Sequence, residues 1–325
     1  MDLNKCRICG NSENNHTFEA EEKMFGTREK FLYFECFKCK CIQIAEIPDD
    51  LSKFYPKDYF SLNLPKTNFV KRFIKKKWYQ HSAGKENVIG KIINKRKGFA
   101  PFYEWLKYTN VNFNSSILDV GSGQGLRLYE LELAGFRNLT GVDPNIDKDS
   151  KIGKNIIIYK KYLGELVGIY DLIMLHFSFE HMPNPKEIMD EAFMLLNKDG
   201  ALLIRIPVTG SFAWEKYGTD WVQLDAPRHI FIHSEKSIEI LAERTGFQIE
   251  NVVYDSTDFQ FWGSILYQNN IPLTATKMFS PDPMSDFRDL ITKDDMIKFS
   301  EDAKKLNLEN RGDQASFYFK KKNQK

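Results

Sequence analysis

From residue 116 onward, short apolar runs alternate with stretches whose apolar residues recur at helical spacing. The first unit is Ser116-Ile-Leu-Asp-Val120, a turn rich in glycine, and then a helical stretch that stops at Gly135. Strands that alternate with helices predict an open, doubly wound α/β sheet. Seven strands are expected, at residues 116–120, 139–143, 155–159, 170–175, 201–207, 248–254 and 315–319.

The stretch before this sheet predicts two amphipathic helices with many cations. Residues 65–98 carry 11 Lys or Arg against 1 Asp or Glu, although the whole chain has a formal net charge of only +2. The apolar positions at helical spacing are Phe69, Val70, Phe73, Ile74 and Trp78, followed by Val88, Ile89, Ile92 and Ile93. One interpretation is that these stripes pack on the following domain and the lysines are solvated. The other is attraction to an anionic partner, either a phosphate-bearing substrate or a membrane surface.

Length and composition are those of a globular protein with more than one folding unit. The 325 residues are 42% hydrophobic, with 12 prolines and 19 glycines, which excludes disordered and collagen-like chains. We expect a small metal-binding domain at 1–64, a basic helical linker at 65–112 and the α/β domain at 113–325. No apolar run approaches the roughly 18 residues of a membrane span, and no signal peptide is evident, so we expect a soluble, cytoplasmic protein.

All five cysteines lie within the first 41 residues, and four of them form two C-x2-C pairs. Cys6 and Cys9 make the first pair, and Cys36 and Cys39 make the second. A reducing compartment disfavours disulfides, whereas two tight turns that each present two thiolates suit a structural zinc ion. Cys41 is the spare thiol. Coincidentally buried cysteines, or a redox or iron–sulfur role, are the alternatives.

The glycine-rich turn indicates a nucleoside-binding site. Gly121, Gly123 and Gly125 let a ligand approach the backbone, and the helix behind them presents unpaired N–H groups. The next strand ends at Asp143, whose carboxylate suits the two hydroxyls of a ribose. A dinucleotide fingerprint would place the third glycine one residue later. Asp119, just before the turn, suits an ammonium group, so S-adenosylmethionine is favoured over NAD.

At these residues the chain resembles the class I S-adenosylmethionine-dependent methyltransferases. The motifs are Ile-Leu-Asp-Val-Gly-Ser-Gly-Gln-Gly at 117–125, Gly-Val-Asp-Pro at 141–144, and the stretch 171–183 that ends in Glu-His-Met-Pro. The resemblance implies a Rossmann-like sheet, with Asp143 at the cofactor's ribose and Leu163 beside its adenine. The residues it implies around the cofactor are Asp119, Gly121, Ser122, Gly123, Gly125, Asp143, Pro144, Leu163 and His176. The cysteine pairs are similar to those of cell-surface polysaccharide and deoxysugar methyltransferases.

Histidines are the candidates for a general base, because methylation of a hydroxyl requires removal of its proton near neutral pH. We expect this base to be His229, with Asp225 to orient it and Arg228 to hold an anionic substrate group. A hydrogen-bonded structural role for His229 is the alternative. His181 and His176 follow the fourth strand, at the edge of the sheet where ligands bind in such folds, and are the other catalytic candidates.

These features predict transfer of a methyl group from S-adenosylmethionine to a sugar hydroxyl. The expected acceptor is a nucleotide-linked or lipid-linked saccharide that carries phosphate, as in surface polysaccharide synthesis. C-methylation of a keto-deoxysugar is the first alternative, and a zinc-ribbon protein that binds nucleic acid is the second. Nucleic acid is the less favoured partner because no Asn/Asp-Pro-Pro-Tyr motif follows the fourth strand. Peripheral contact with a membrane remains open.

Overall fold

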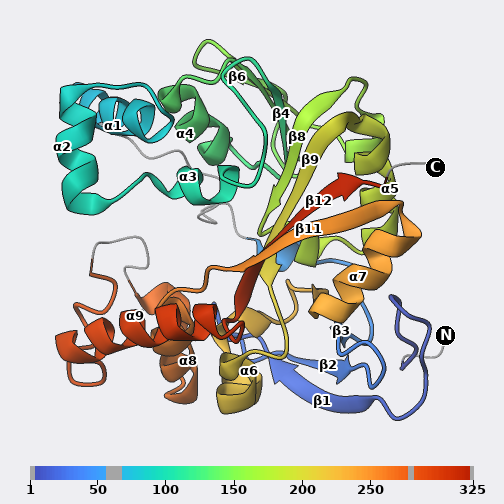
Figure 1. The fold of residues 1–325 in the computed structure, drawn as a ribbon. Helices are drawn as coiled ribbons and strands as arrows, with labels where there is room; N and C mark the ends of the chain where they lie inside the picture. Colours follow the sequence, from blue (N-terminus) through green and yellow to red (C-terminus); the bar gives the residue numbers. More distant parts are fainter. Residues whose placement is uncertain (1–3, 56–67, 277–281, 323–325) are drawn as a thin grey trace.

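The computed structural model describes residues 4–55, 68–276 and 282–322. Within these ranges, eight strands form one sheet in the order β11-β12-β9-β8-β4-β5-β7-β6 (Figure 1). Their bounds are β4 Ser116–Val120, β5 Asn138–Val142, β6 Ser150–Ile152, β7 Ile156–Tyr159, β8 Tyr170–His176, β9 Leu196–Pro207, β11 Phe247–Tyr254 and β12 Gln314–Lys321. All seven expected strands are present, so the doubly wound α/β fold is confirmed. Strand β6 is an addition that the sequence pattern did not indicate.

Five neighbouring strands run parallel and set the direction of the sheet. These are β9, β8, β4, β5 and β7. Strand β12 is inserted antiparallel between β9 and β11, and β6 closes the other edge antiparallel to β7. Because the parallel strands share one direction, the loops that follow β4, β5, β7 and β8 emerge at the same edge of the sheet.

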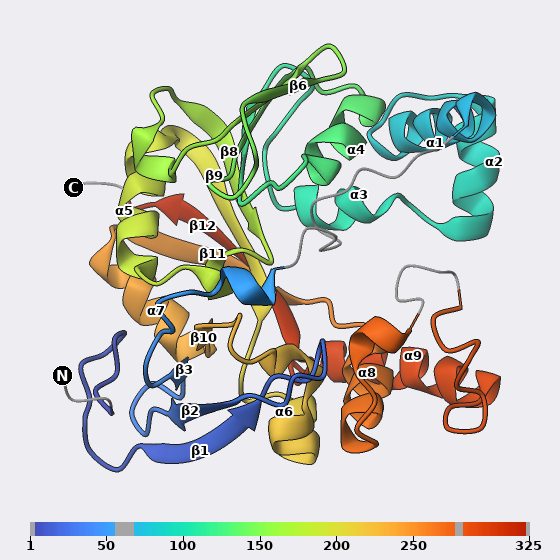
Figure 2. The ribbon, with the colours of Figure 1, turned by 180° about the vertical axis from the view of Figure 1, so that it is seen from behind.

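Successive residues of the central strands pack on opposite faces, as the period of two requires. Ile117 lies in the buried cluster that includes helix α4, and its neighbour Leu118 lies in the cluster that includes α5 and α7. Figures 1 and 2 show α4 on one side of the sheet and α5 and α7 on the other. The helices are α3 Pro101–Leu106, α4 Leu126–Ala134, α5 Pro185–Leu195, α6 Phe212–Tyr217, α7 Glu235–Arg244, α8 Phe259–Gln268 and α9 Lys293–Leu308.

A second, four-stranded sheet combines three N-terminal strands with a later one in the order β1-β2-β3-β10 (Figure 2). Its strands are β1 His16–Glu21, β2 Lys30–Glu35, β3 Ile42–Ile44 and β10 Phe231–Ile232. Phe231 pairs with Gln43 in an antiparallel register. The small sheet is therefore not built from residues 1–64 alone. The expected boundary at residue 64 lies within 56–67, outside the described residues, and the division into domains stays a prediction.

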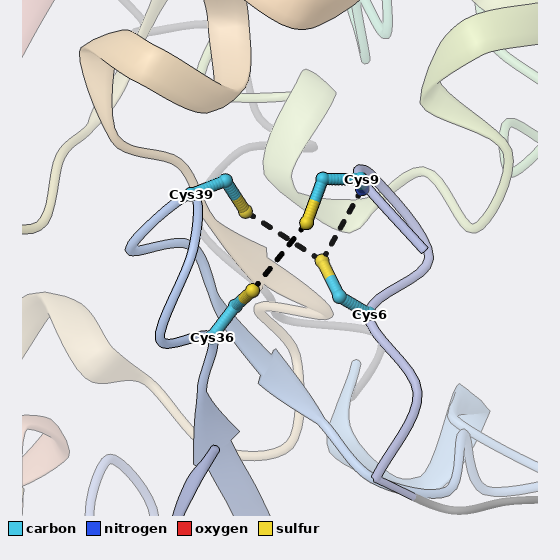
Figure 3. A group of neighbouring side chains, drawn as sticks. All are labelled: Cys6, Cys9, Cys36 and Cys39. Atoms are coloured by element: carbon cyan, nitrogen blue, oxygen red, sulfur yellow. Dashed lines mark hydrogen bonds between the residues drawn. The ribbon is translucent and has the colours of Figure 1, made fainter. Parts of the chain in front are cut away.

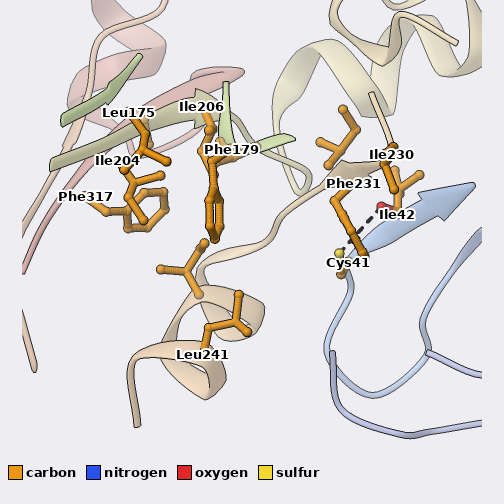
Figure 4. Packing of buried hydrophobic residues seen from close by; sticks show 14 of the residues in the cluster. Cys41, Ile42, Leu175, Phe179, Ile204, Ile206, Ile230, Phe231, Leu241 and Phe317 are labelled. Atoms are coloured by element: carbon orange, nitrogen blue, oxygen red, sulfur yellow. Dashed lines mark hydrogen bonds between the residues drawn. The ribbon is translucent and has the colours of Figure 1, made fainter. Parts of the chain in front are cut away.

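The two sheets share one hydrophobic core. The same buried cluster includes Ile42 of β3 and Phe231 of β10 together with Leu175 and Phe317 of the large sheet. In Figure 4, Phe179 stands between the strands of the large sheet and helix α7, while Ile42 and Phe231 lie together on the side of the small sheet. The chain that follows β8 thus links both sheets.

The two basic helices form where expected, as α1 Phe69–Ser82 and α2 Val88–Lys97. The Tyr79 hydroxyl of α1 donates to Glu130 of α4 at 2.9 Å. Val70 and Val88, however, are exposed, so the interpretation in which the apolar stripes pack on the following domain is wrong for much of both helices. No helix within the described ranges is long and apolar enough to cross a membrane. A cytoplasmic location stays a prediction.

Candidate active site

The glycine loop has the backbone geometry that the sequence predicts. Gly121, Gly123 and Gly125 have φ angles of 72°, 50° and 76°, in the region that favours glycine. A Cβ atom on Gly121 would lie 2.5 Å from the Cβ atom of Ser178. Gly125 is the N-cap of helix α4, and no side chain of the described residues caps the first N–H groups of this helix. The loop therefore offers free backbone donors to a ligand.

Two carboxylates lie beside this loop. Asp143, at the end of β5, accepts hydrogen bonds from the backbone N–H groups of Gly123 at 2.9 Å and of Asn145 at 2.8 Å. Each carboxylate oxygen keeps a lone pair for a further donor. Asp119 is buried, and burial raises its pKa to about 7, although Arg127 acts in the opposite direction. A cationic ligand beside Asp119 would lower this pKa again.

His176 and Ser122 supply buried polar atoms near the loop. Both ring nitrogens of His176 and the hydroxyl of Ser122 have no hydrogen-bond partner among the described residues. Burial and the nearby Arg127 lower the pKa of His176 well below its ordinary value. Leu163, at the start of the 3-10 turn after β7, is buried, and Pro144 directly follows Asp143. The cofactor roles given to these residues stay predictions.

His229 is held by a backbone carbonyl. Its Nδ1 atom lies 2.8 Å from the carbonyl oxygen of Gln223, so Nδ1 carries the proton and Nε2 presents a lone pair. The carboxylates of Asp225 and Glu180 lie 3.8 Å and 3.9 Å from Nε2. Burial lowers the pKa of His229, and Asp225 offsets this only in part. The imidazole is therefore neutral at pH 7, with its basic nitrogen directed toward two carboxyl groups.

Asp225 and Arg228 do not have the roles that the sequence predicted for them. Arg228 is fully buried, and its guanidinium pairs with Asp225 at 2.5 Å and with Glu22 at 3.1 Å. Burial acts to raise the pKa of Asp225, but Arg228 outweighs it and keeps that pKa below its usual value. The expectation that Arg228 holds a substrate anion was wrong, because its guanidinium is already paired with the carboxylates of Glu22 and Asp225. The Gln223 carbonyl, rather than Asp225, orients the His229 ring.

His181 lies against His229, with ring centroids 4.8 Å apart and an edge-to-face angle of 64°. Its Nδ1 atom is 2.8 Å from the carbonyl oxygen of Arg228 and 3.1 Å from the hydroxyl of Tyr55. Burial, and then the neighbouring His229, lower the pKa of His181 to about 3. These contacts fix the ring and suit a positioning role better than that of a proton acceptor.

Glu180 is a site residue that sequence reasoning missed. It is fully buried, and neither carboxyl oxygen has a hydrogen-bond partner within the described part of the chain. Burial raises its pKa to about 8, so the carboxyl group is largely protonated at pH 7. The available signal was its place next to His181 in the Glu-His-Met-Pro motif. Nothing in that motif reveals that the side chain points inward.

One loop connects the two halves of the site. After β8, the hydroxyl of Ser178 donates to the carbonyl oxygen of Val120 at 2.8 Å, beside the glycine loop. Two residues later, the carbonyl oxygen of Glu180 accepts the N–H of Ile230 at 2.9 Å, next to His229. The loop that follows the fourth parallel strand therefore places the glycine loop and the histidine pair on the same edge of the sheet.

The four predicted ligand cysteines converge at one point (Figure 3). The Sγ atoms of Cys6 and Cys39 are 3.6 Å apart, and those of Cys9 and Cys36 are 3.5 Å apart. All four sulfur atoms lie within 4.8 Å of one another. Cys41 is buried outside the cluster, as expected.

Comparison with known proteins identifies the family. The model of a methyltransferase domain matches residues 88–252, slightly more than half of the chain. EEF1A lysine methyltransferase 2 of Danio rerio is 49% identical over 39 residues, which cover 12% of this chain and 17% of that protein's length.

Similar solved structures include a cyclopropane synthase and an N-methyltransferase, both of low identity. The cyclopropane synthase MmaA2 from Mycobacterium tuberculosis is 15% identical, with 66% of this chain and 80% of that chain covered at a TM-score of 0.42. Coclaurine N-methyltransferase is 16% identical, with 79% and 89% covered at a TM-score of 0.44. The expected enzyme class, an S-adenosylmethionine-dependent methyltransferase, is confirmed by the domain match, and the chain belongs to the methyltransferase domain family.

Proposed function

We propose that the chain methylates a hydroxyl group of a sugar-like acceptor, with S-adenosylmethionine as the donor and His229 as the general base. The observation that carries this proposal is the hydrogen bond from Nδ1 of His229 to the carbonyl oxygen of Gln223. This hydrogen bond fixes the tautomer in which Nε2 can accept a proton. Burial lowers the pKa of the ring and so keeps it neutral at pH 7. A nucleotide-linked or lipid-linked saccharide remains the proposed acceptor, with no residue assigned to its phosphate.

The residues of the glycine loop fit the donor. Gly121 and Gly125 have the positive φ angles that shape the loop, and Asp143 can accept hydrogen bonds from ribose hydroxyls beside Gly123. Asp119 offers a carboxyl group for an ammonium, and His176 adds buried nitrogen atoms that have no partner in the described part of the chain. When bound, S-adenosylmethionine supplies an electrophilic methyl group that an acceptor attacks in line.

His229, His181 and Glu180 have different roles in the proposed reaction. Nε2 of His229 takes the proton of the attacking hydroxyl, and His181 holds the His229 ring in place from its side. Glu180, protonated at neutral pH, can donate a hydrogen bond to the acceptor. Nε2 of His229 and a carboxyl oxygen of Glu180 are 3.9 Å apart, so both can lie about 2.8 Å from one hydroxyl oxygen, a usual hydrogen-bond length. His229 and Glu180 can therefore hold the same acceptor group.

The protonated Glu180 also favours a second candidate, C-methylation of a keto sugar. There, His229 would remove a proton from the carbon next to a carbonyl, and the Glu180 carboxyl would donate to the carbonyl oxygen as it becomes negative. Both candidates use the same two side chains, so the acceptor distinguishes them.

We also propose that the four-cysteine cluster holds a structural zinc ion. A tetrahedral site with Zn–S bonds of about 2.3 Å requires sulfur atoms roughly 3.8 Å apart, close to the observed 3.5 and 3.6 Å. The side-chain amide of Gln43 donates to Sγ of Cys6 at 2.8 Å, as an outer hydrogen bond to a metal ligand would. The ion would fasten the two cysteine turns to each other, with no open position for catalysis.

Transfer of labelled methyl groups from S-adenosylmethionine to a panel of nucleotide sugars and lipid-linked glycans tests the acceptor class. A labelled hydroxyl product supports O-methylation. For keto sugars, exchange of the α-proton with deuterium in D2O, abolished in His229→Ala, supports C-methylation instead. Binding of duplex DNA or RNA that weakens steeply with salt, together with no binding of S-adenosylmethionine, would contradict both candidates.

A further inference from the structure

Helices α1 and α2 expose an apolar patch that methyl transfer does not explain. We call residues 69–97 the basic arm. Phe69 and Val88 are 82% and 75% exposed. Exposed apolar residues are ordinary when scattered singly, but here they gather on two adjacent helices. The exposed apolar side chains of the arm are Phe69, Val70, Phe73, Ile74, Val88, Ile89 and Ile92.

The arm has defined internal contacts, so the exposure does not come from a frayed terminus. The indole N–H of Trp78 donates to the carbonyl oxygen of Gly98 at 2.9 Å. The side-chain amide of Asn87 donates to the backbone carbonyl oxygen of Lys77 at 3.0 Å. Tyr79 fastens α1 to α4. Both views of the fold show α1 and α2 at an outer corner of the molecule, far from the small sheet (Figures 1 and 2).

The charge of the arm decides which partner fits the patch. Glu86 is its only acid, and the cations exposed on it are Lys71, Arg72, Lys76, Lys91, Lys95, Arg96 and Lys97. A second copy of the same arm would bring like charges together, which is unfavourable. Nucleic acid would use the cations but leave the aliphatic side chains in water. An anionic lipid surface uses both, because cations attract the headgroups while apolar side chains enter the acyl boundary.

We propose that the basic arm docks the enzyme reversibly on the surface of an anionic lipid bilayer. The arm lies on the membrane and does not span it. Apolar burial and headgroup attraction each contribute, so the docking requires both the exposed apolar residues and the lysines.

Co-sedimentation of the full chain with lipid vesicles tests the proposal. One set of vesicles contains phosphatidylcholine alone, and the other contains equal parts of phosphatidylcholine and phosphatidylglycerol. The wild type should sediment with the anionic vesicles and remain in solution with the neutral ones. The variant Phe69→Ser/Val88→Ser and the charge variant Lys76→Glu/Lys91→Glu should each partition at least about tenfold more weakly.

The matched controls carry the same kinds of substitution at exposed residues outside the basic arm. Val167 and Leu308 are 97% and 87% exposed, so Val167→Ser/Leu308→Ser removes as much apolar surface outside the arm. Lys236→Glu/Lys304→Glu, at exposed lysines of α7 and α9, gives the same change in net charge. Both controls should sediment like the wild type, and all variants should keep their affinity for S-adenosylmethionine.

Three results would overturn the proposal. The first is equal sedimentation of arm variants and wild type with anionic vesicles. The second is equal loss in the matched controls, which would show a general effect of charge or hydrophobicity. The third is a wild-type dimer in light scattering that Phe69→Ser/Val88→Ser converts to a monomer, because the patch would then be covered by a second copy.

Discussion

Replacement of His229 by alanine tests the proposed acceptor site most directly. The variant loses the imidazole base together with the 2.8 Å hydrogen bond to Gln223. A lost hydrogen bond of this kind costs about 1 kcal/mol of folding free energy. Loss of a general base lowers turnover about 10²–10⁴-fold, or about 3–5 kcal/mol of activation free energy. Turnover should therefore fall far more than the population of folded protein.

The assay separates chemistry from binding and folding. Steady-state methyl transfer gives kcat and KM, calorimetry gives the affinity for S-adenosylmethionine, and thermal unfolding reports stability. His229→Ala should lower kcat while its cofactor affinity stays near that of the wild type, because the glycine loop does not contact His229. His16→Ala, an exposed histidine of β1, is the matched control and should change none of these quantities. Turnover of His229→Ala within about threefold of wild type would refute the assignment.

The pH profile gives an independent check on the same residue. An unperturbed imidazole has a pKa of about 6.5, but burial lowers the pKa of His229. The ring therefore stays neutral, and able to accept a proton, as the pH drops below 6.5. With S-adenosylmethionine kept saturating at each pH, kcat should persist at pH 6 and decline only through the lowered pKa of His229. A decline centred near 6.5 would indicate a solvent-exposed imidazole and contradict the geometry described here.

Three further predictions concern the cofactor and the metal. Asp143→Ala should weaken S-adenosylmethionine binding at least about tenfold in calorimetry, because hydrogen bonds to a carboxylate contribute about 1.5–3 kcal/mol each; unchanged affinity would exclude the ribose role. Below its pKa of about 7, protonation of Asp119 removes the negative charge, so affinity should fall by up to about tenfold per pH unit. Asp119→Asn should flatten that dependence. Elemental analysis should find one zinc per chain in wild type and Cys41→Ser but none in Cys36→Ser, and zinc retained by Cys36→Ser would contradict the ligand set.

The parts of the fold that could be predicted are those with a local pattern. A short apolar run predicts strands such as β4, in which the adjacent residues Ile117 and Leu118 face opposite layers. Glycine spacing predicts the loop, because positive φ angles are a property of single residues. The spacing of the cysteines similarly predicts that Cys6 and Cys36 meet at one cluster.

The parts that could not be predicted depend on contacts between distant segments. Strand β10 is two residues long and exists only because Phe231 pairs with Gln43 of β3. Arg228 was expected to face a substrate, but its partner Glu22 lies 206 positions away in the sequence, and their ion pair buries both. The raised pKa of Glu180 follows mainly from burial, and burial of an ionisable residue has no signature in a short motif.

These distant contacts connect the cysteine cluster to the proposed acceptor site. The hydroxyl of Tyr33 in β2 donates to the carbonyl oxygen of His229 at 2.8 Å, and Glu22 pairs with the adjacent Arg228. The hydroxyl of Ser234 donates to the carbonyl oxygen of Cys39, a proposed zinc ligand. The segment that carries His229 is thus held at several points by the part of the chain that the cysteines fasten. Chelation of the proposed zinc ion should therefore lower methyl transfer while the glycine loop, which none of these contacts involves, still binds S-adenosylmethionine. Equal loss of both on chelation would instead show that the large sheet depends on the metal as well.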